Sequence, residues 1–432
     1  MKKIIYFLLI FAIFSLFSSI CYAQWVAQTN PSSNNLLDVS FINRNTGWAC
    51  GDGGVIIKTT NAGTNWELQN SGVTDKNLFG IHAIDSQYVY CVGWFETILK
   101  TTNGGTNWII IRNGPWGQGA SFFGLYFLNR NIGWMLKNFY ILRTTDGCNT
   151  FDSTLSIFSY LRDIYFKDDL TGILCGDGSL IMKSTDGGVV WNQITIPQTT
   201  TESPDFFKES FVGNTGWVVG RGTNTPGLGP NVWTTTNFGT NWDTIGRVPY
   251  PYEAENYCVY FSGLSTGWCG GSYGYLFKTP NGGFNWYQQV VPSNYFRRSM
   301  WFYNDSIGWA VGGAGQILYT TTSGQYVGVE KISGEIPKDF HLYQNYPNPF
   351  NPSTKIKFDI PNFPLMKGAR GMSVRLTIYD ILGREIATLV NQQLNPGMYE
   401  VEWDASNYPS GVYFYKINTE SFNQTKRMVL IK

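Results

Sequence analysis

Short apolar runs separated by polar turns recur along most of this chain. In the first unit, VSF (39–41) leads to GWACG (47–51), then to VIIKTT (55–60), and after a further turn to WELQ (66–69). Runs of β-branched and aromatic residues bounded by Gly and Asn predict four antiparallel strands. Runs such as VIIK are apolar at nearly every position, which is typical of strands that are covered on both faces.

One phrase closes each of these units. KTTNGGTNW stands at residues 100–108, related phrases stand at 58–66, 143–151, 183–191, 234–242 and 278–286, and a shortened YTTTSG stands at 319–324. The closing aromatic residues are 40 to 51 positions apart. A four-stranded unit with a period of about 40 to 50 residues predicts a β-propeller blade. Seven units therefore predict a seven-bladed propeller over residues 24–324.

The last unit lacks its Trp-led fourth strand. It supplies apolar runs at 299–303, 308–312 and 316–321, and the missing type of run, WVAQ, stands at 25–28. We predict that residues 25–28 form the outer strand of the last blade, pair with the strand that ends at Thr321, and so close the ring.

The repeated turn has a local cause. Asn61 can accept hydrogen bonds from backbone amides of its own turn, Gly63 can adopt the positive φ that the reversal requires, and Trp66 can pack across the sheet. The equivalent positions are Asn103, Gly105, Trp108, Asp146, Asp186, Gly188, Trp191, Asn237, Gly239, Trp242, Asn281, Gly283 and Trp286. Cys148 replaces the turn glycine in the third unit, so we expect that turn to be strained or differently shaped.

Two resemblances follow from these residues. The pattern S/T-x-D/N-x-G-x-T/N-W resembles the Asp-box of bacterial neuraminidase repeats. The longer pattern from Gly-Trp to the closing Trp resembles the propellers of photosystem II stability and assembly factors, over about residues 25–324. In those families the box is a structural hairpin on the face away from the active site. The resemblance implies a structural role for the box residues, without catalysis or metal binding.

A different pattern begins at Phe340, after a polar connector at 325–339. Short alternating strands between 340 and 432 predict a small immunoglobulin-like β-sandwich. The motifs NYPNPFNP, YDILGRE, SGVYFYKI and KRMVLIK resemble the C-terminal sorting domain of proteins exported by the type IX secretion system. The resemblance implies that the outer-membrane machinery of that system is a partner, and that the protein is released or attached to the cell surface after passing through the periplasm.

The amino terminus is consistent with export. Lys2 and Lys3 precede an apolar run at 4–20, and Cys21 to Ala23 form a small-residue cleavage site, so residues 1–23 predict a signal peptide. An uncleaved anchor is the alternative. Removing Lys2 and Lys3 changes the formal charge from +1 to −1, so no strong field favours nucleic acid as a partner. Only 14% of residues are charged whereas 16% are aromatic, which suits an extracellular all-β monomer.

The cysteine and histidine content limits which metal sites and disulfides the chain can form. Six cysteines remain after cleavage and no pair forms a C-x-x-C motif, while His82 and His341 are the two histidines, so we expect no metal site and no cofactor. Buried free thiols are the first interpretation. A disulfide between Cys258 and Cys269, on neighbouring strands of one unit, is the alternative.

Strand alternation assigns the loops to two faces. The Asp-boxes share one face with turns such as 43–46, and the between-blade connections share the other with the loops between second and third strands. Long loops at 112–120, 197–206, 221–231 and 247–256 lie on that second face, which we call the variable face. The candidate ligand-binding residues are Arg112, Trp116, Arg221, Arg247, Tyr250 and Tyr252. Flat rings and planar cations suit a glycan or a protein segment.

A sialidase-like glycoside hydrolase is the enzymatic alternative, because Asp-box propellers include neuraminidases. Glu253 and Glu255 could act as paired carboxylates. The arginine motif of that family is absent from the amino-terminal part, and no matching Tyr and Glu context is evident. We therefore predict a non-catalytic, exported recognition protein, with no catalytic residue to name.

Overall fold

The structure is a computed structural model. It describes residues 25–115, 117, 120–156, 159–196, 204–221, 231–250, 254–289, 291–321, 330–333, 335–362, 372–405, 408–419 and 421–432. The predicted signal peptide at 1–23 lies outside these residues. The chain divides into two compact units, which lie within 24–326 and 327–432. Among the described residues, no helix is long and apolar enough to cross a membrane.

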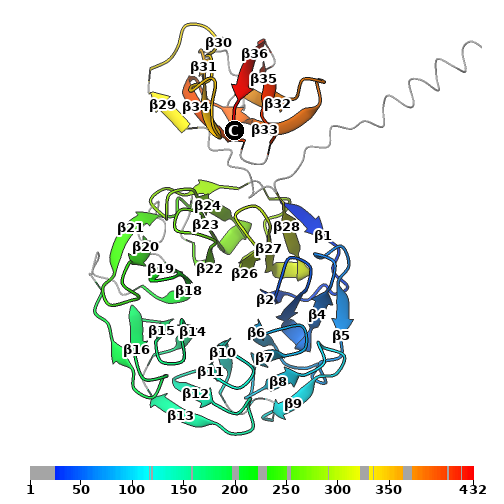
Figure 1. The fold of residues 1–432 in the computed structure, drawn as a ribbon, viewed down its shortest axis with the longest axis vertical. Helices are drawn as coiled ribbons and strands as arrows, with labels where there is room; N and C mark the ends of the chain where they lie inside the picture. Colours follow the sequence, from blue (N-terminus) through cyan, green and yellow to red (C-terminus); the bar gives the residue numbers. More distant parts are fainter. Residues whose placement is uncertain are drawn as a thin grey trace, which may run out of the picture. The chain divides into compact units, whose positions relative to one another are not determined.

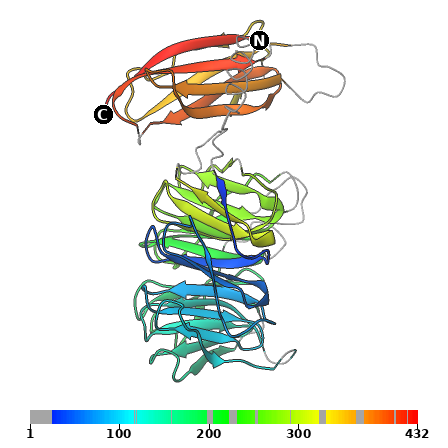
Figure 2. The same ribbon diagram turned by 90° about the vertical axis from the view of Figure 1, so that its right-hand side faces the viewer.

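The first unit is a ring of seven four-stranded antiparallel sheets (Figures 1 and 2). The strands of blades one to three are β2 (Leu36–Phe41), β3 (Gly47–Gly51), β4 (Ile56–Thr59), β5 (Glu67–Gln69); β6 (Leu78–Ala83), β7 (Val89–Gly93), β8 (Ile98–Thr101), β9 (Ile109–Arg112); and β10 (Phe122–Phe127), β11 (Gly133–Lys137), β12 (Tyr140–Thr144), β13 (Asp152–Ser156). In every blade the first strand lies nearest the axis (Figure 1).

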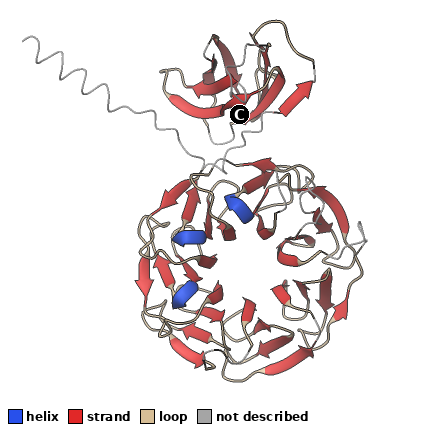
Figure 3. Cartoon of the chain, turned by 180° about the vertical axis from the view of Figure 1, so that it is seen from behind, coloured by secondary structure: helices blue, strands red, loops and turns tan. Residues whose placement is uncertain are grey.

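Blades four to six repeat this order. Their strands are β14 (Leu161–Phe166), β15 (Gly172–Gly176), β16 (Leu180–Ser184), β17 (Asn192–Gln193); β18 (Phe206–Val212), β19 (Thr215–Gly220), β20 (Asn231–Thr235), β21 (Asp243–Arg247); and β22 (Asn256–Phe261), β23 (Gly267–Gly271), β24 (Leu276–Thr279), β25 (Tyr287–Gln288). The short helices η1 (Asp52–Gly54), η2 (Ser272–Gly274) and η3 (Gly313–Gly315) lie between second and third strands of three blades (Figure 3).

The seventh blade closes the ring as the sequence predicts. Its strands β26 (Arg297–Phe302), β27 (Gly308–Gly312) and β28 (Ile317–Thr320) are completed by β1 (Val26–Gln28), with Ala27 opposite Leu318. Trp25 is fully buried against Phe302. Gln28 also contacts the first blade, where it donates to Ala62 O at 2.8 Å and accepts from Trp66 Nε1 at 3.1 Å. The amino-terminal strand therefore joins the last blade to the first.

Neighbouring blades are held together by stacked aromatic rings. At five of the seven junctions, the aromatic residue that begins the second strand of one blade lies parallel to the Phe that ends the inner strand of the next. The ring centroids are 3.5 to 4.1 Å apart in the pairs Tyr90–Phe127, Trp134–Phe166, Trp217–Phe261, Trp268–Phe302 and Trp309–Phe41. Burial and stacking of large rings make these junctions a main source of stability.

The glycine of each Gly-Trp pair makes room for this Phe. In the third blade Phe127 lies opposite Gly133 in the sheet, and a Cβ on Gly133 would come 2.4 Å from the Phe127 ring. The same close approach occurs at Gly47, Gly172, Gly216, Gly267 and Gly308. In the second blade the larger residue of the pair is on the second strand, because Val89 lies opposite Ala83. The two positions together thus still combine a larger with a smaller residue.

Each Asp-box turn is held by its own side chains. In the first blade, Thr59 Oγ1 donates to Asn61 Oδ1 at 3.1 Å, Gly63 N donates to Thr59 Oγ1 at 2.9 Å, and Asn65 N donates to Asn61 Oδ1 at 2.9 Å. Equivalent bonds hold the turns of Asn103, Asp146, Asp186, Asn237 and Asn281. Cys148 keeps the same bond to Thr144 but adopts a φ of 72°, so the turn keeps its shape and a side chain occupies a left-handed backbone position.

Backbone contacts place the loops on two faces as expected. Ala62 N donates to Asn45 O, which puts the Asp-box beside the turn between the first and second strands. Asp52 N donates to Asn35 O, which puts the loop between second and third strands beside the between-blade connection.

The six cysteines among the described residues are all free and buried. The alternative of a Cys258–Cys269 disulfide is not realised, because the two residues are not opposite each other: Cys258 pairs with Gly270, and Cys269 pairs with Val259. Neighbouring positions along a strand point to opposite faces of the sheet. The two thiols accordingly pack in different core clusters.

The second unit is a sandwich of two four-stranded antiparallel sheets. One sheet contains β29 (Glu330–Ser333), β34 (Gly397–Asp404), β31 (Ser353–Ile360) and β30 (His341–Leu342), and the other contains β33 (Glu385–Leu394), β32 (Met372–Tyr379), β35 (Gly411–Thr419) and β36 (Asn423–Leu430). The connector expected at 325–339 is wrong in one respect, because β29 pairs with β34. Its sequence EKIS carries no apolar alternation that could reveal a strand.

The size exchange between Phe and Gly gives a direct test of junction packing. We expect Gly133→Val to destabilise the propeller by at least about 2 kcal/mol, because its side chain overlaps Phe127. Adding Phe127→Ala, which copies the second blade, should recover about 1 to 2 kcal/mol relative to the sum of the single changes. Denaturant titration of the four proteins measures this coupling. In a control cycle, Gly133→Val is combined with Phe261→Ala in a distant blade, and the two changes in unfolding free energy should add. If the changes in the Phe127 cycle also add, the two residues do not share a packing site and the account is contradicted.

Candidate binding site at the mouth of the central channel

Every inner strand of the propeller contains a β-bulge near its start. The pairing with the second strand skips one residue in each blade, for example between Leu36 and Asp38. The skipped residues are Leu37, Phe79, Phe123, Arg162, Phe207, Tyr257 and Arg298. All seven are half-buried. A bulge re-aims a side chain, and seven equivalent bulges place these residues around one end of the central channel. We call them the mouth ring.

Aromatic rings touch one another along the first half of the mouth ring. The Phe79 and Phe123 centroids are 5.3 Å apart, and Trp94 extends the contact from Phe79 at 6.0 Å. The guanidinium of Arg162 continues the series, since it lies 5.6 Å from the Phe123 ring and 5.5 Å from the Phe207 ring.

The second half continues in the same way. Phe207 and Tyr257 are 5.8 Å apart, and the Arg298 guanidinium lies 5.0 Å from the Tyr257 ring. A run of aromatic rings and planar cations therefore passes from the second blade to the seventh. At the first blade it is interrupted by Leu37.

The mouth ring opens into a cavity of about 260 Å³. The next residue of each inner strand forms the layer below, and four polar side chains of that layer line the cavity: Asp38, Asp163, Lys208 and Ser299. Gly80 and Gly124 occupy the same layer and also line the cavity. The site thus has aromatic walls and a charged floor.

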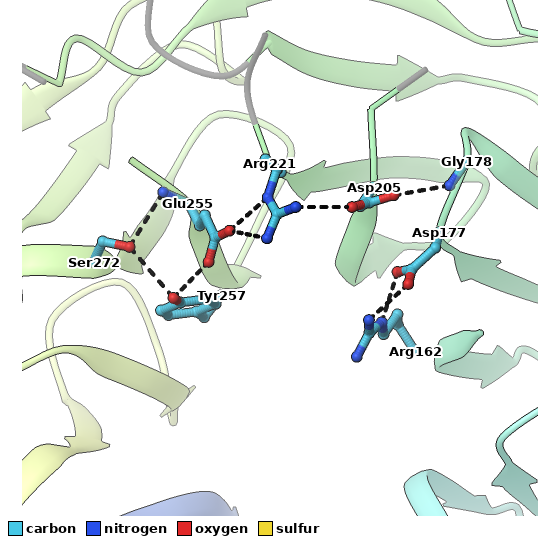
Figure 4. A network of polar contacts seen from close by, with 8 residues as sticks. All are labelled: Arg162, Asp177, Gly178, Asp205, Arg221, Glu255, Tyr257 and Ser272. Carbon is cyan, nitrogen blue, oxygen red and sulfur yellow. Dashed lines mark hydrogen bonds and ion pairs between the residues drawn. The ribbon is translucent and has the colours of Figure 1, made fainter. Parts of the chain in front are cut away.

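Carboxylates fix two arginines at the rim (Figure 4). Arg162 donates two hydrogen bonds of 2.7 Å to the two oxygens of Asp177. Arg221 donates to Glu255 Oε1 at 2.5 Å and lies 3.5 Å from Asp205 Oδ2. The bond to Glu255 raises the pKa of Arg221. Two-point pairing of a guanidinium with a carboxylate holds its plane in a fixed orientation.

Glu255 also orients the mouth ring. Tyr257 donates its hydroxyl to Glu255 Oε2 at 2.6 Å, and Glu255 N donates to Ser272 Oγ at 3.3 Å. Burial and the Glu255 carboxylate raise the pKa of Tyr257, so its hydroxyl stays protonated at neutral pH. Figure 4 shows this network crossing three blades.

Arg298 is the arginine of the mouth ring that is not held by a carboxylate. Within the described parts of the chain, its contact is the face of Tyr257, and burial lowers its pKa. A cation that stacks on a ring and keeps its hydrogen-bond donors free is available to an incoming acceptor.

The floor of the cavity is an ion cluster. Lys208 Nζ lies 2.9 Å from Asp163 Oδ1. Burial raises the pKa of Asp163, while Lys208 opposes that rise. Burial would lower the pKa of Lys208, but the Asp163 and Asp38 carboxylates raise it, so this side chain remains charged. Asp38 accepts hydrogen bonds from Ile81 N at 2.9 Å and Ser299 Oγ at 2.6 Å.

Glu209 stands behind this cluster at a position where the other blades carry apolar side chains. It is 6% exposed, and within the described residues neither carboxyl oxygen has a hydrogen-bond partner of normal geometry. Burial, and then the nearby Asp163 charge, raise the pKa of Glu209 well above its usual value. Both effects favour the protonated, uncharged form of Glu209 in the folded protein.

Only part of the sequence-based site lies at this mouth. Arg221 lines the cavity. Arg112 ends the outer strand β9 and pairs with Glu96 at 2.7 Å, and Arg247 ends the outer strand β21. Both are therefore placed at the periphery, away from the mouth ring. Trp116 and Tyr252 lie outside the described residues, as does Glu253 of the carboxylate pair.

The expectation that Tyr250 is presented to a ligand is wrong. The ring is 3% exposed, and its hydroxyl donates to Asn256 Oδ1 at 2.8 Å. It packs against Phe277 in the core of the sixth blade. A loop tyrosine between prolines gave no indication that its ring turns inward.

The seven residues of the mouth ring are not among the candidates predicted from the sequence, because those candidates were chosen in loops. The ring lies on strands, where an aromatic residue is normally interpreted as core. Aligning the repeats on their inner strands does give a signal: six of the seven second positions are aromatic or Arg, next to apolar first positions in most blades.

The described residues contain no cluster of three or more His, Cys, Asp or Glu side chains that could hold a metal ion. The acidic groups of the cavity floor are engaged with Lys208, Ser299 and backbone amides.

Comparison with known proteins identifies the propeller. A family model described as photosynthesis system II assembly factor YCF48 matches residues 18–121 and 150–292, more than half of the chain. The chain belongs to the YCF48 family. The photosystem II assembly lipoprotein Ycf48 of Synechococcus sp. (strain CC9902) is 28% identical over 129 residues, which cover 30% of this chain and 36% of the relative. The stability/assembly factor HCF136 of Arabidopsis thaliana is 29% identical over 132 residues, covering 29% and 30%.

The alignments with these YCF48-type relatives thus span about a third of the relatives' length. Solved structures agree in fold. A YCF48 bound to D1 peptide has a TM-score of 0.56 and 22% identity, covering 70% of this chain and 98% of that one. YCF48 from Cyanidioschyzon merolae has a TM-score of 0.56 and 16% identity, covering 68% and 98%.

The second unit has its own match. A model described as secretion system C-terminal sorting domain matches residues 344–432. The resemblances to photosystem II assembly factors and to the type IX sorting domain are thereby confirmed. The protein is an exported YCF48-like propeller with a type IX sorting domain, and its destination is secretion or the cell surface.

The buried acid gives a pH test of the channel. Because folding raises the pKa of Glu209, the folded protein keeps a proton that the unfolded chain loses above about pH 4.3. The stability of the wild type relative to Glu209→Gln should therefore fall by up to about 1.4 kcal/mol per pH unit above that value, until the folded pKa is reached. Denaturant titrations at pH 5, 6 and 7 measure this, with the exposed Glu67→Gln as a control for net charge. A difference that does not change with pH would show that Glu209 is ionised in the folded state.

Proposed function

We propose that this protein is a non-catalytic recognition protein that binds a segment of another protein at the mouth ring. The observation that carries the proposal is the uninterrupted series of rings and guanidiniums from Phe79 to Arg298. Aromatic and guanidinium faces stack on planar amide groups and on apolar side chains, and they lose little conformational entropy when they bind.

The size of the cavity favours a protein segment over a bound small molecule. Its volume of about 260 Å³ is below the usual 300 to 1,000 Å³ of small-molecule sites. Such a cavity suits one side chain of a segment whose backbone lies across the ring. A related YCF48 structure contains a D1 peptide, which supports a protein ligand for this chain as well. A glycan is the alternative ligand, to be tested alongside a peptide.

Preorganisation supports binding at this place. Asp177 and Glu255 fix the planes of Arg162 and Arg221, and Glu255 also fixes the hydroxyl of Tyr257. A ligand therefore orders few side chains when it binds, which lowers the entropic cost of association. Arg298 supplies free donors in the same ring.

One contact favours a second candidate, a sialidase-like glycoside hydrolase. Such an enzyme needs a Tyr beside a Glu and a group of arginines. Tyr257 donates to Glu255, and both residues line the same cavity as Arg162 and Arg298. The pairing is unfavourable for this chemistry, because Glu255 is shared with Arg221 and the pKa of Tyr257 is raised. A fluorogenic sialoside panel tests it: turnover that disappears in Tyr257→Phe would replace the binding proposal.

The binding proposal is tested with peptides selected from a random library on the purified propeller. We expect Phe123→Ala and Arg298→Gln each to weaken binding of such a peptide by about tenfold or more, since residues at the centre of an interface carry most of its affinity. Phe284→Ala is the matched control, because Phe284 is 63% exposed on the Asp-box face. Isothermal titration measures the three affinities, with a glycan array in parallel. Equal affinity of the mouth variants and wild type would refute the proposal.

A further inference from the structure

The sequence motifs of the sorting domain converge at one end of the sandwich. The loop of NYPNPFNP joins the last strand, because Phe350 N donates to Val429 O and Ile431 N donates to Phe350 O, both at 3.0 Å. Ala405 N donates to Pro352 O at 2.9 Å, which brings the end of β34 to the same place. We call this the motif end.

The hairpin tip between β32 and β33 belongs to the motif end. Tyr379 at the end of β32 pairs with Phe414, near the start of β35. The loop before that strand is tied to the hairpin, since Tyr408 donates its hydroxyl to Ile386 O at 3.0 Å. Motifs far apart in sequence therefore build one surface.

The tip is rigid. Asp380 Oδ1 accepts hydrogen bonds from Leu382 N and Arg384 N, both at 2.9 Å, and Asp380 Oδ2 pairs with Arg384 Nε at 2.6 Å. Gly383 takes a φ of 75°, which this turn requires. A carboxylate that receives three hydrogen bonds from its own turn fixes the backbone on which the tip side chains stand.

Two large apolar side chains stand on this rigid turn. Ile381 is 72% exposed and Leu382 is 74% exposed. Tyr346 and Ile431, at the same end, are also exposed. Several exposed apolar side chains on one small surface mark a site of interaction, because a domain gains nothing from holding them in water.

We propose that Ile381 and Leu382 are the contact by which the outer-membrane machinery of type IX secretion recognises this sorting domain. The occupant is a folded protein with an apolar pocket that accepts the two side chains. A sorting domain must be bound by its secretion machinery. The turn held by Asp380 presents the pair without further ordering, so little conformational entropy is lost when the two side chains enter a pocket. The proposal does not depend on the ligand of the propeller, because its test measures only how much of the protein is exported.

The test expresses the full chain in a host that has type IX secretion. We expect the double variant Ile381→Ser with Leu382→Ser to lower the fraction of the protein at the cell surface and in the medium by tenfold or more, with accumulation in the periplasm. The conservative variant Ile381→Val with Leu382→Met should be exported like the wild type. Immunoblots of the separated fractions measure both.

Ile336→Ser is the matched control, because Ile336 is 58% exposed and lines a pocket with His341 and Met398 at the other end of the sandwich. It should be exported normally. The purified double variant should melt within about 2 °C of the wild type, since exposed side chains contribute little to stability. Normal export of the double variant would overturn the proposal, and so would an equal loss in Ile336→Ser. If the double variant melts at a lower temperature, Leu382→Lys alone, on the same exposed turn, repeats the test, and its normal export would overturn the proposal.

Discussion

The fit between a Phe near the end of the inner strand and a Gly near the start of the second strand, made in six of the seven blades, is the constraint on which the propeller depends. Phe127 lies over Gly133 of its own blade, and it is stacked by Tyr90 of the preceding blade at 3.7 Å. One ring thus links two strands of a blade and two neighbouring blades. Trp134 repeats the stack on the next blade and also donates to Gly187 O at 3.0 Å, in an Asp-box turn. The same stack recurs at three further junctions, the last of them between Trp309 of the seventh blade and Phe41 of the first.

With this packing, the Asp-box face and the variable face of the propeller have different roles. On one face, six Asp-box turns satisfy their own polar groups, for example through Asn61 and Thr59. The turns of Asp186 and Asn281 also accept a hydrogen bond from the indole of the preceding blade. On the other face, the bulge after the first residue of every inner strand frees one side chain from the sheet. Repetition then gives a ring of seven such side chains around the channel. Their identity is free to vary because the junctions do not use them.

Much of the fold could be predicted from sequence because its signals are local. The box turn predicts a hairpin from a few polar residues, and its period gives the number of blades. The missing Trp after Thr321 and the spare Trp25 are enough to predict closure, which the pairing of Ala27 with Leu318 confirms.

For the candidate site, the sequence predicts the face on which the mouth ring lies but not its residues, since its geometry depends on bulges and on side-chain direction. Arg221 lies at the mouth, but Tyr250 turns into the core and Arg112 pairs with Glu96 at the periphery. The Arg162–Asp177 pair could not be expected from spacing, because the two residues come together only when the bulge of β14 faces the loop after β15. The disulfide alternative failed for a related reason: Cys258 and Cys269 are close in the sheet and on opposite faces of it.

Hydrogen exchange of the purified propeller, with and without a peptide selected from a random library, tests the central claim most directly. The account predicts slower exchange on peptide binding in the first residues of the inner strands and in the adjoining loops of the variable face. The six Asp-box turns should exchange at unchanged rates. Protection of the Asp-box turns, with the mouth ring unaffected, would contradict the account.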